Sequence, residues 1–313
     1  TKRNPEGIAL RFEEQSYSYA ALNAWANQIA HFYLSLGAKK GDVVAVMVEN
    51  RPELIASVIG LAKLGVTTAL VNTSQVGKVL THSINLVKPI ALIVGEECRH
   101  AVNEIRNDLN ISSDRLHWFA DQNTQADPGQ APEGFINLAE KTDLAPKFNP
   151  STTHSVQGKD GLFYIYTSGT TGLPKAVIFT NGRWTLAYGT YGHVLNLNKD
   201  DVMYCTLPLY HATGMVVCWC GVIAGSSTLA IRRKFSTSSF WKDVQKFDAS
   251  AIGYVGELCR YLMDAPPSEL EKGHRVTKMI GNGMRPNIWD KFKSRFGIQE
   301  VLELYASLSL IHI

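Results

Sequence analysis

Helical and extended patterns alternate along most of the 313-residue chain, and this alternation limits the possible folds more than any single motif. Between residues 18 and 36, apolar side chains recur at helical spacing until Gly37 ends the pattern. Residues 42–48 (DVVAVMV) then form a short apolar run typical of a buried strand, and a helical pattern at 51–65 precedes an extended one at 66–71. Strands separated by helices predict parallel sheets covered by helices, an α/β fold.

Two polar loops divide the chain. Residues 121–134 and 149–161 are rich in polar residues, proline and glycine, and little between them can form a core. The alternation then resumes, and a hydrophobic content of 45% is enough for a substantial core. We therefore predict a first α/β subdomain at 1–150, a second at 151–307, and an atypical tail at 308–313.

Charge and cysteine usage argue against several classes of protein. The net charge is +3 and no run of Lys or Arg indicates a nucleic-acid surface, so no nucleic-acid partner is predicted. The five cysteines show no metal-ligand spacing, which predicts no metal site among them and favours a reducing compartment. No stretch has the length and continuity of a membrane span, and no signal peptide opens the sequence.

Residues 166–175 (YTSGTTGLPK) crowd hydroxyls, glycines and a lysine between two strand-like runs. Glycines allow backbone N–H groups to approach an anion, hydroxyls add donors and the lysine adds charge, so we predict a phosphate-binding loop rather than an ordinary polar hairpin. A Walker A loop is excluded because no glycine precedes the lysine, no Ser or Thr follows it, and a strand comes next. The candidate residues are Thr167, Ser168, Gly169, Thr170, Thr171, Gly172 and Lys175.

The segment 164–177 (YIYTSGTTGLPKAV) resembles the phosphate-loop signature of the adenylate-forming acyl-CoA synthetase superfamily. Further matches follow in the expected order at 207–214 (LPLYHATG), 254–262 (YVGELCRYL) and 281–289 (GNGMRPNIW). Together with residues 50–74, they are similar to the branch of fatty acid transport proteins, or very-long-chain acyl-CoA synthetases. The resemblance covers nearly the whole chain.

This resemblance implies a ligase that works in two steps. A fatty carboxylate attacks the α-phosphate of Mg²⁺-ATP to give an acyl-adenylate and pyrophosphate, and the thiol of coenzyme A then attacks the acyl carbon. Transferred by motif, Thr167 and Lys175 act at the phosphates and His211 lies where the carboxylate meets the α-phosphate. A packed core histidine is the alternative for His211. Fatty acid, ATP and coenzyme A are the implied partners, with Mg²⁺ as the cofactor ion.

The adenine site is also implied by the resemblance. Gly281, Asn282 and Gly283 align with the segment that passes beside the adenine. Tyr305 matches an aromatic residue that stacks on the base. Without the neighbouring motifs, the glycines would indicate only a turn and the tyrosine an inward-facing strand residue.

The acyl pocket is less sharply defined. Tyr254, Gly256 and residues 215–225 are candidates for its walls, and plain helix and strand core is the open alternative. No carboxylate lies between residues 205 and 220 to pair with a substrate amine, which favours a fatty acid over an amino acid.

The resemblance implies an acyl-CoA synthetase-like N-terminal domain. Two subdomains of helix-packed sheets meet at the nucleotide, the C-terminal domain is absent, and a membrane anchor lies outside these residues. The implied location is the endoplasmic reticulum or plasma membrane, with the catalytic domain facing the cytosol. Three functions stay open, in descending order: a fatty acid–CoA ligase coupled to fatty acid uptake, a non-catalytic fatty acid transport or lipid-handling protein, and a different adenylate-forming enzyme such as a luciferase or an amino-acid-activating domain.

The end of the chain departs from the family pattern. After residues 303–307 (ELYAS), the family expects a Thr or Ser and then a Glu that helps to hold magnesium, whereas this chain has Leu308, Ser309 and Leu310. Neither leucine nor serine can replace a carboxylate at a magnesium ion.

We therefore predict that the 313-residue chain has little or no ligase activity, although it still binds ATP weakly through its loop. Fatty acyl-CoA formation by the purified chain measures this. Robust turnover would contradict the prediction.

Overall fold

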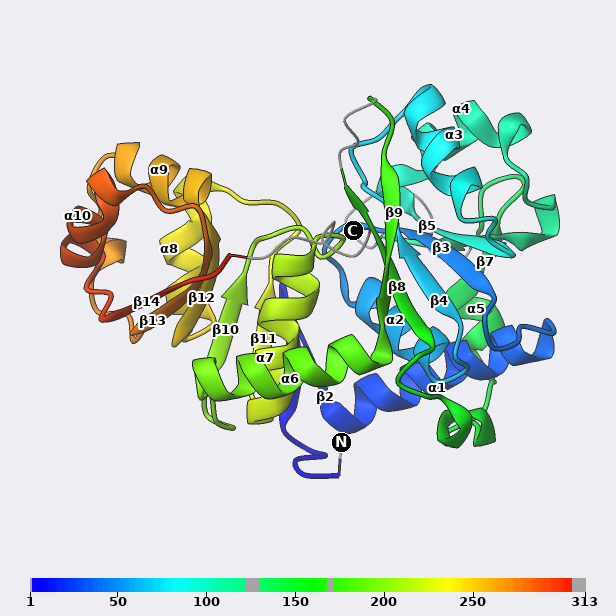
Figure 1. The fold of residues 1–313 in the computed structure, drawn as a ribbon, viewed down its shortest axis with the longest axis horizontal. Helices are drawn as coiled ribbons and strands as arrows, with labels where there is room; N and C mark the ends of the chain where they lie inside the picture. Colours follow the sequence, from blue (N-terminus) through cyan, green and yellow to red (C-terminus); the bar gives the residue numbers. More distant parts are fainter. Residues whose placement is uncertain (1, 122–129, 168–171, 306–313) are drawn as a thin grey trace. The chain divides into compact units, whose positions relative to one another are not determined.

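The computed structural model describes residues 2–121, 130–167 and 172–305. These residues form two compact α/β units, one of residues 21–185 and one of residues 1–20 together with 186–313 (Figure 1). Each unit contains one seven-stranded sheet within the described part of the chain. The prediction of two subdomains built on helix-packed sheets is confirmed.

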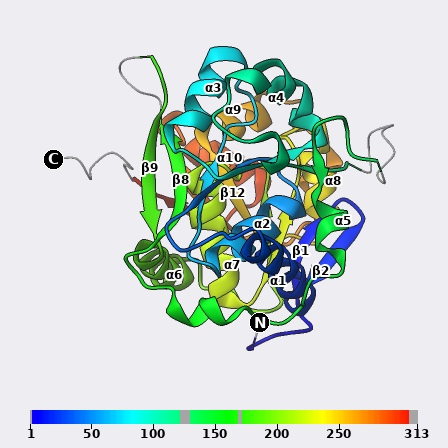
Figure 2. The same ribbon diagram turned by 90° about the vertical axis from the view of Figure 1, so that its right-hand side faces the viewer.

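The first sheet belongs to residues 21–185. Its strands are β3 (Val43–Met47), β4 (Thr67–Leu70), β5 (Ala91–Gly95), β6 (Leu116–Phe119), β7 (Ile136–Asn137), β8 (Gly161–Thr167) and β9 (Lys175–Thr180). They lie in the order β7-β6-β5-β3-β4-β8-β9, and β3 pairs with both β4 and β5, so the winding changes direction there. All pairs are parallel except β8 and β9, an antiparallel hairpin that Figure 2 shows at one edge of the sheet.

Helices cover this sheet. They are α1 (Tyr19–Ser35), α2 (Pro52–Ala62), α3 (Gly77–Leu86), α4 (Arg99–Ile105) and α5 (Leu138–Asp143), with short 3-10 turns at Glu96–Cys98, Arg106–Asp108, Ser113–Arg115 and Ser151–Ser155. Pro52 starts α2 at a position whose N–H would have no helical partner, and Glu53 complements the helix dipole. Gly60 allows α1 to approach α2 closely, because a Cβ there would lie 2.6 Å from the backbone oxygen of Ala26.

The second sheet belongs to residues 1–20 and 186–313. Its strands are β1 (Ile8–Phe12), β2 (Gln15–Ser18), β10 (Val202–Cys205), β11 (Thr228–Ile231), β12 (Ala251–Val255), β13 (Lys278–Asn282) and β14 (Glu300–Glu303). The order is β14-β13-β12-β10-β11-β1-β2, and all pairs are parallel except the β1–β2 hairpin. The helices are α6 (Asn181–Leu195), a π-helix (Thr213–Cys218), α7 (Trp219–Gly225), α8 (Thr237–Lys246), α9 (Gly256–Asp264), a 3-10 turn (Glu269–Glu271) and α10 (Pro286–Phe296).

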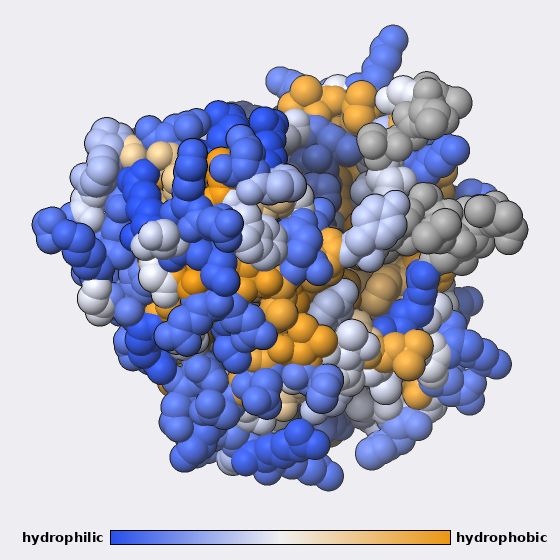
Figure 3. Space-filling model, turned by 60° about the vertical axis from the view of Figure 1, so that its left-hand side comes forward, coloured by the Kyte–Doolittle hydropathy of each residue, from blue (hydrophilic) through white to orange (hydrophobic). Residues whose placement is uncertain are grey.

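Helix α6 is held by the close approach of its Gly192 to α7 rather than by a broad apolar face. Leu195 is its buried residue, whereas Leu186 and Val194 are 73% and 40% exposed. A Cβ at Gly192 would lie 2.5 Å from the Cβ of Ala224 on α7, so only glycine permits this approach. Figure 3 shows apolar residues reaching the surface between hydrophilic ones on the face that it views.

The division of the chain differs from the boundary predicted between residues 150 and 151. β8 pairs with β4, where Phe163 aligns with Thr68, so the β8–β9 hairpin belongs to the unit of residues 21–185. The N-terminal residues form the β1–β2 hairpin and belong to the unit of residues 186–313, because Leu10 of β1 aligns with Leu229 of β11. Both differences come from pairing between strands far apart in sequence, and local patterns do not encode such pairing.

Other predictions from composition can be compared with the described residues. All five cysteines are buried free thiols. Within the described part of the chain, no three or more His, Cys, Asp or Glu side chains gather in a metal-binding group. No helix in the same residues combines the length and apolar character that crossing a membrane requires.

His117 is a buried titratable group on β6, and its ring is fully enclosed. Its Nδ1 lies 2.6 Å from the hydroxyl of Tyr33 on α1, and its Nε2 has no hydrogen-bond partner among the described residues. A charged ring would need acceptors for two N–H groups and would find at most one. Burial, reinforced by the charge of Arg115, lowers the pKa of His117 to about 4.

We expect the unfolding free energy to fall below about pH 6.5, the pKa of an unperturbed histidine. Below about pH 6.5 the unfolded chain binds a proton at His117, whereas the folded chain binds it only near pH 4. The free energy of unfolding therefore falls by about 1.4 kcal/mol per pH unit over this range, and by about 3 kcal/mol in all. Urea unfolding of His117→Gln, which keeps a partner for the Tyr33 hydroxyl but does not titrate, should show a flatter pH dependence. His154→Gln, at an exposed histidine, is the control and should keep the original slope. Equal slopes for the original chain and His117→Gln would contradict the prediction.

Candidate functional site

The predicted phosphate loop connects the two strands of the β8–β9 hairpin. Thr167 ends β8, Lys175 begins β9, and the two residues are paired across the antiparallel ladder. Gly172 has a φ of +89°, a left-handed conformation that favours glycine. Ser168, Gly169, Thr170 and Thr171 lie outside the described residues. The predicted strand–loop–strand context is confirmed, and Lys175 is exposed.

The hairpin is fixed to the core just below this loop. Phe163 on β8 is 1% exposed and stacks on Phe179 of β9 with ring centroids 5.9 Å apart. Tyr166, one residue before Thr167, donates its hydroxyl to the backbone oxygen of Ser83 on α3 at 2.6 Å. Burial raises the pKa of Tyr166, so the hydroxyl remains a neutral donor. Both strands are therefore held in place where they enter the loop.

Three other predicted segments lie at one edge of the second sheet. His211 follows β10, Gly281 and Asn282 end β13 with Gly283 next, and Tyr305 follows β14. Because β10, β12, β13 and β14 are parallel neighbours, their carboxyl ends share an edge. β10 also pairs on both sides, with β11 and β12, at the point where the winding changes direction. Open α/β sheets bind ligands at such a switch point.

His211 is exposed, so the alternative of a packed core histidine does not describe it. Its ring lies against Tyr210, with centroids 4.6 Å apart, and its backbone N–H donates to the Pro208 carbonyl at 3.1 Å. Partial desolvation lowers the pKa of His211 below its usual value. The imidazole is therefore neutral at neutral pH and offers one N–H donor and one acceptor.

Gly281 and Gly256 approach neighbouring backbone so closely that glycine is required at both positions. A Cβ at Gly281 would lie 2.0 Å from the backbone oxygen of Tyr254, and one at Gly256 would lie 1.7 Å from the backbone oxygen of Gly283. Gly283 has a φ of +81°. Asn282 is exposed between the two glycines. Glycine is therefore needed at 281 for packing and favoured at 283 by its backbone conformation, and the sequence alone did not show either reason.

Glu303 is a residue of this edge that sequence reasoning missed. Its carboxylate accepts hydrogen bonds from the backbone N–H of Gly283 and, at 2.5 Å, from the hydroxyl of Tyr254. The backbone N–H of Leu304 donates to the Gly281 carbonyl at 2.8 Å. Glu303 thus fixes the end of β13 to β14, and Tyr305, 97% exposed, follows directly. Glu303 is the first residue of the ELYAS segment (residues 303–307), and this position was the sequence feature that could have identified it.

The candidates for the acyl pocket are largely core residues. Met215, Cys218 and Val222 are fully buried in the π-helix and α7, which favours the core interpretation for this run. Tyr254 is also fully buried. Burial and the hydrogen bond to Glu303 raise the pKa of Tyr254, so its hydroxyl is an engaged donor. The assignment of these residues to an acyl pocket stays a prediction.

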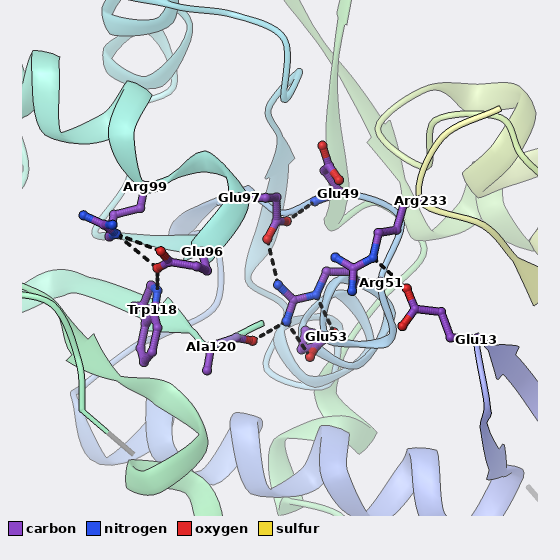
Figure 4. A network of polar contacts seen from close by, with 10 residues as sticks. All are labelled: Glu13, Glu49, Arg51, Glu53, Glu96, Glu97, Arg99, Trp118, Ala120 and Arg233. Atoms are coloured by element: carbon purple, nitrogen blue, oxygen red, sulfur yellow. Dashed lines mark hydrogen bonds and ion pairs between the residues drawn. The ribbon is translucent and has the colours of Figure 1, made fainter. Parts of the chain in front are cut away.

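The carboxyl edge of the first sheet carries an ion-pair network (Figure 4). Arg51, shortly after β3, is 2% exposed, and its guanidinium donates to Glu53 and Glu97 at 2.7 Å each and to the Ala120 carbonyl at 2.5 Å. Glu97 also accepts from the backbone N–H of Glu49 at 2.7 Å. The Arg51 guanidinium is therefore engaged by the fold rather than presented to a ligand.

Comparison with known proteins places the chain among related sequences. The sequence model of the family described as AMP-binding enzyme matches residues 1–307. Medium/long-chain-fatty-acid–CoA ligase FadD6 of Mycobacterium tuberculosis is 37% identical over 306 residues, 97% of this chain and 49% of that protein. Long-chain fatty acid transport protein 1 of Bos taurus is 38% identical over 315 residues, 98% of this chain and 47% of that protein. The chain spans about half the length of these curated relatives.

The fold also matches solved structures. A fatty acyl CoA synthetase of Mycobacterium tuberculosis superimposes with a TM-score of 0.81 at 22% identity, covering 98% of this chain and 57% of that one. The acyl-CoA synthetase-like α/β fold predicted from the sequence is confirmed.

The close approach at Gly281 can be tested by mutation. Gly281→Ala should lower the free energy of unfolding by about 1–3 kcal/mol, because its methyl group overlaps a buried carbonyl. Gly189→Ala on α6 is the matched control, since no atom lies within 4 Å of a Cβ there, and it should be neutral or stabilise by up to about 1 kcal/mol. Urea unfolding measures both, and an unchanged stability for Gly281→Ala would refute the packing argument.

Proposed function

Because the chain belongs to the AMP-binding enzyme family, we propose that, in a version with the length of its relatives, it functions in the ATP-dependent activation of a long- or very-long-chain fatty acid to its coenzyme A ester, coupled to fatty acid uptake, and that this activity is impaired in the 313-residue chain. The family and the relative named as a medium/long-chain-fatty-acid–CoA ligase support this proposal. The substrates are fatty acid, ATP and coenzyme A, and the intermediate is an acyl-adenylate.

The β8–β9 hairpin is the observation that carries the proposal. In the first step, a carboxylate oxygen bonds to the α-phosphorus while the bond to the bridging oxygen breaks, and pyrophosphate leaves with the electron pair. Negative charge grows on this leaving group. The ammonium of Lys175 and the hydroxyl of Thr167, paired at the base of the loop, are suited to stabilise it. In the second step, the coenzyme A sulfur bonds to the acyl carbon and AMP leaves.

The edge of the second sheet supplies the proposed adenine and carboxylate contacts. Neutral His211 donates its N–H to an oxygen of the fatty carboxylate or of the α-phosphate. Gly281, Asn282 and Gly283 pass beside the adenine, and the close contact of Gly281 with the Tyr254 backbone fixes this segment. The exposed ring of Tyr305 stacks on the base.

The described residues do not form a magnesium site by themselves. No three carboxylates or other metal ligands gather among them, and the Glu303 carboxylate already accepts from Gly283 and Tyr254. Magnesium prefers oxygen ligands and commonly binds through substrate phosphates. We therefore assign no step of the reaction to a metal held by these residues.

A second candidate function is non-catalytic fatty acid transport or lipid handling at the endoplasmic reticulum or plasma membrane. The relative named as a long-chain fatty acid transport protein favours it. Ligation can itself account for uptake, because conversion to the coenzyme A ester removes free fatty acid and draws more across the membrane. We therefore place the ligase first.

Substitution of Lys175 tests the nucleotide site. Lys175→Ala should weaken ATP binding by about tenfold, because a charge-assisted contact to the outer phosphates is lost, while AMP binding stays unchanged. Lys78→Ala, at an exposed lysine on α3 of the same unit, is the control and should bind ATP like the original chain. Equilibrium dialysis with labelled nucleotides measures both. Equal ATP affinity in Lys175→Ala and the original chain would remove the support for the phosphate site.

The same substitution separates ligase from transporter in a version extended to the length of the relatives. If Lys175→Ala abolishes both acyl-CoA formation and fatty acid uptake in cells, uptake depends on ligation. Uptake that persists without ligation would favour the transport function.

A further inference from the structure

We propose that His82 is a positioning residue for the phosphate loop, an inference that rests on the proposed function. His82 lies on α3, which Leu80 and Ile84, both fully buried, fix in the core. The Nε2 of His82 is 3.0 Å from the backbone oxygen of Pro174, the residue immediately before Lys175. The two partners are 92 residues apart, so the loop motif gives no indication of this contact.

The partner of His82 determines which ring nitrogen carries the hydrogen. A carbonyl oxygen can only accept, so the Nε2 of His82 carries a hydrogen and donates it. The imidazole does this in both its neutral and its charged form, because Nε2–H is present in each. The hydrogen bond directs the Pro174 carbonyl toward α3. That oxygen carries partial negative charge and would repel a phosphate, so its direction keeps this repulsion away from an anion beside the Lys175 ammonium.

Helix α3 holds both strands of the hairpin. The backbone oxygen of Ser83, the next residue after His82, accepts a hydrogen bond from the hydroxyl of Tyr166 on β8 at 2.6 Å. His82 binds the backbone oxygen of Pro174, directly before β9. The proline ring restricts φ at residue 174, and the pairing of Thr167 with Lys175 restricts the residue that follows. The peptide between Pro174 and Lys175 therefore has little freedom left. Because this peptide is already ordered before a phosphate binds, no binding free energy is lost in ordering it.

A purely structural role and a positioning role predict different ligand effects. If His82 only stabilised the fold, its loss would affect all nucleotides equally. If His82 positions the loop exit, its loss affects contacts to the outer phosphates, which ATP has and AMP lacks. The ratio of ATP to AMP affinity is therefore the informative measurement.

Equilibrium dialysis of the 313-residue chain with labelled ATP and AMP tests the proposal. We expect His82→Ala to weaken ATP binding about fivefold to tenfold, the effect of losing one hydrogen bond, with AMP affinity within about twofold of the original. His82→Gln, whose side-chain amide also offers an N–H donor, should restore most of the ATP affinity.

Asn85→Ala is the matched control on the same helix. Asn85 donates to the Asp108 carbonyl at 2.8 Å and accepts from the Asn110 backbone at 2.9 Å, so it anchors α3 to a different loop. Asn85→Ala should keep the ATP-to-AMP ratio even if urea unfolding shows lower stability. An equal loss of ATP and AMP affinity in His82→Ala, or a matching change of ratio in Asn85→Ala, would overturn the proposal.

The experiment also separates this inference from the proposed function. If the original chain binds ATP and His82→Ala binds it equally well, the role of His82 is refuted and the ATP site stands. If the original chain binds no ATP, the proposed function fails and the role of His82 fails with it.

Discussion

Parallel pairing between strands is the constraint on which both units depend. Each crossover returns the chain in the same direction, so the segments that follow successive strands collect at one edge of a sheet. In the second sheet, this places His211, residues 281–283 and Tyr305 along one edge. The antiparallel hairpins β1–β2 and β8–β9 end their sheets, where a strand needs a partner on one side only. The β8–β9 hairpin is therefore the last pair of strands in its sheet.

The carboxyl edges of the two sheets carry different kinds of contact. In the first sheet, Arg51 is buried against Glu53 and Glu97, and its loss would leave carboxylates unpaired, so this network serves the fold. In the second sheet, Gly256 and Gly281 remove side chains from the same kind of edge and let backbone segments touch. In the proposed function, the first edge holds no substrate group, the second is assigned to the adenine, and the phosphates are assigned to the positive charge of Lys175 on the β8–β9 hairpin.

The parts of the structure that the sequence predicts are those governed by local physics. The alternation of helix and strand, and the strands on both sides of the phosphate loop, follow from residue spacing and glycine content. The pairing of β1 with β11, the unit boundary and the contacts of Glu303 could not be predicted, because each depends on a partner far away in sequence. β6 was missed for another reason: His117 interrupts its apolar run, and its burial depends on Tyr33 from α1.

The distinction between local and distant contacts also applies to the proposed phosphate site: local residues identify it, and distant contacts hold it in place. The groups proposed to contact phosphate lie together between Thr167 and Lys175, so a motif can reveal them. The groups that hold them, Tyr166 against Ser83 and Pro174 against His82, join the hairpin to a helix from another part of the chain. A loop with the same residues but without that helix would have to become ordered when it binds, and the entropy lost would weaken its affinity. On the proposed function, the strength of phosphate binding therefore depends on α3 as well as on the motif.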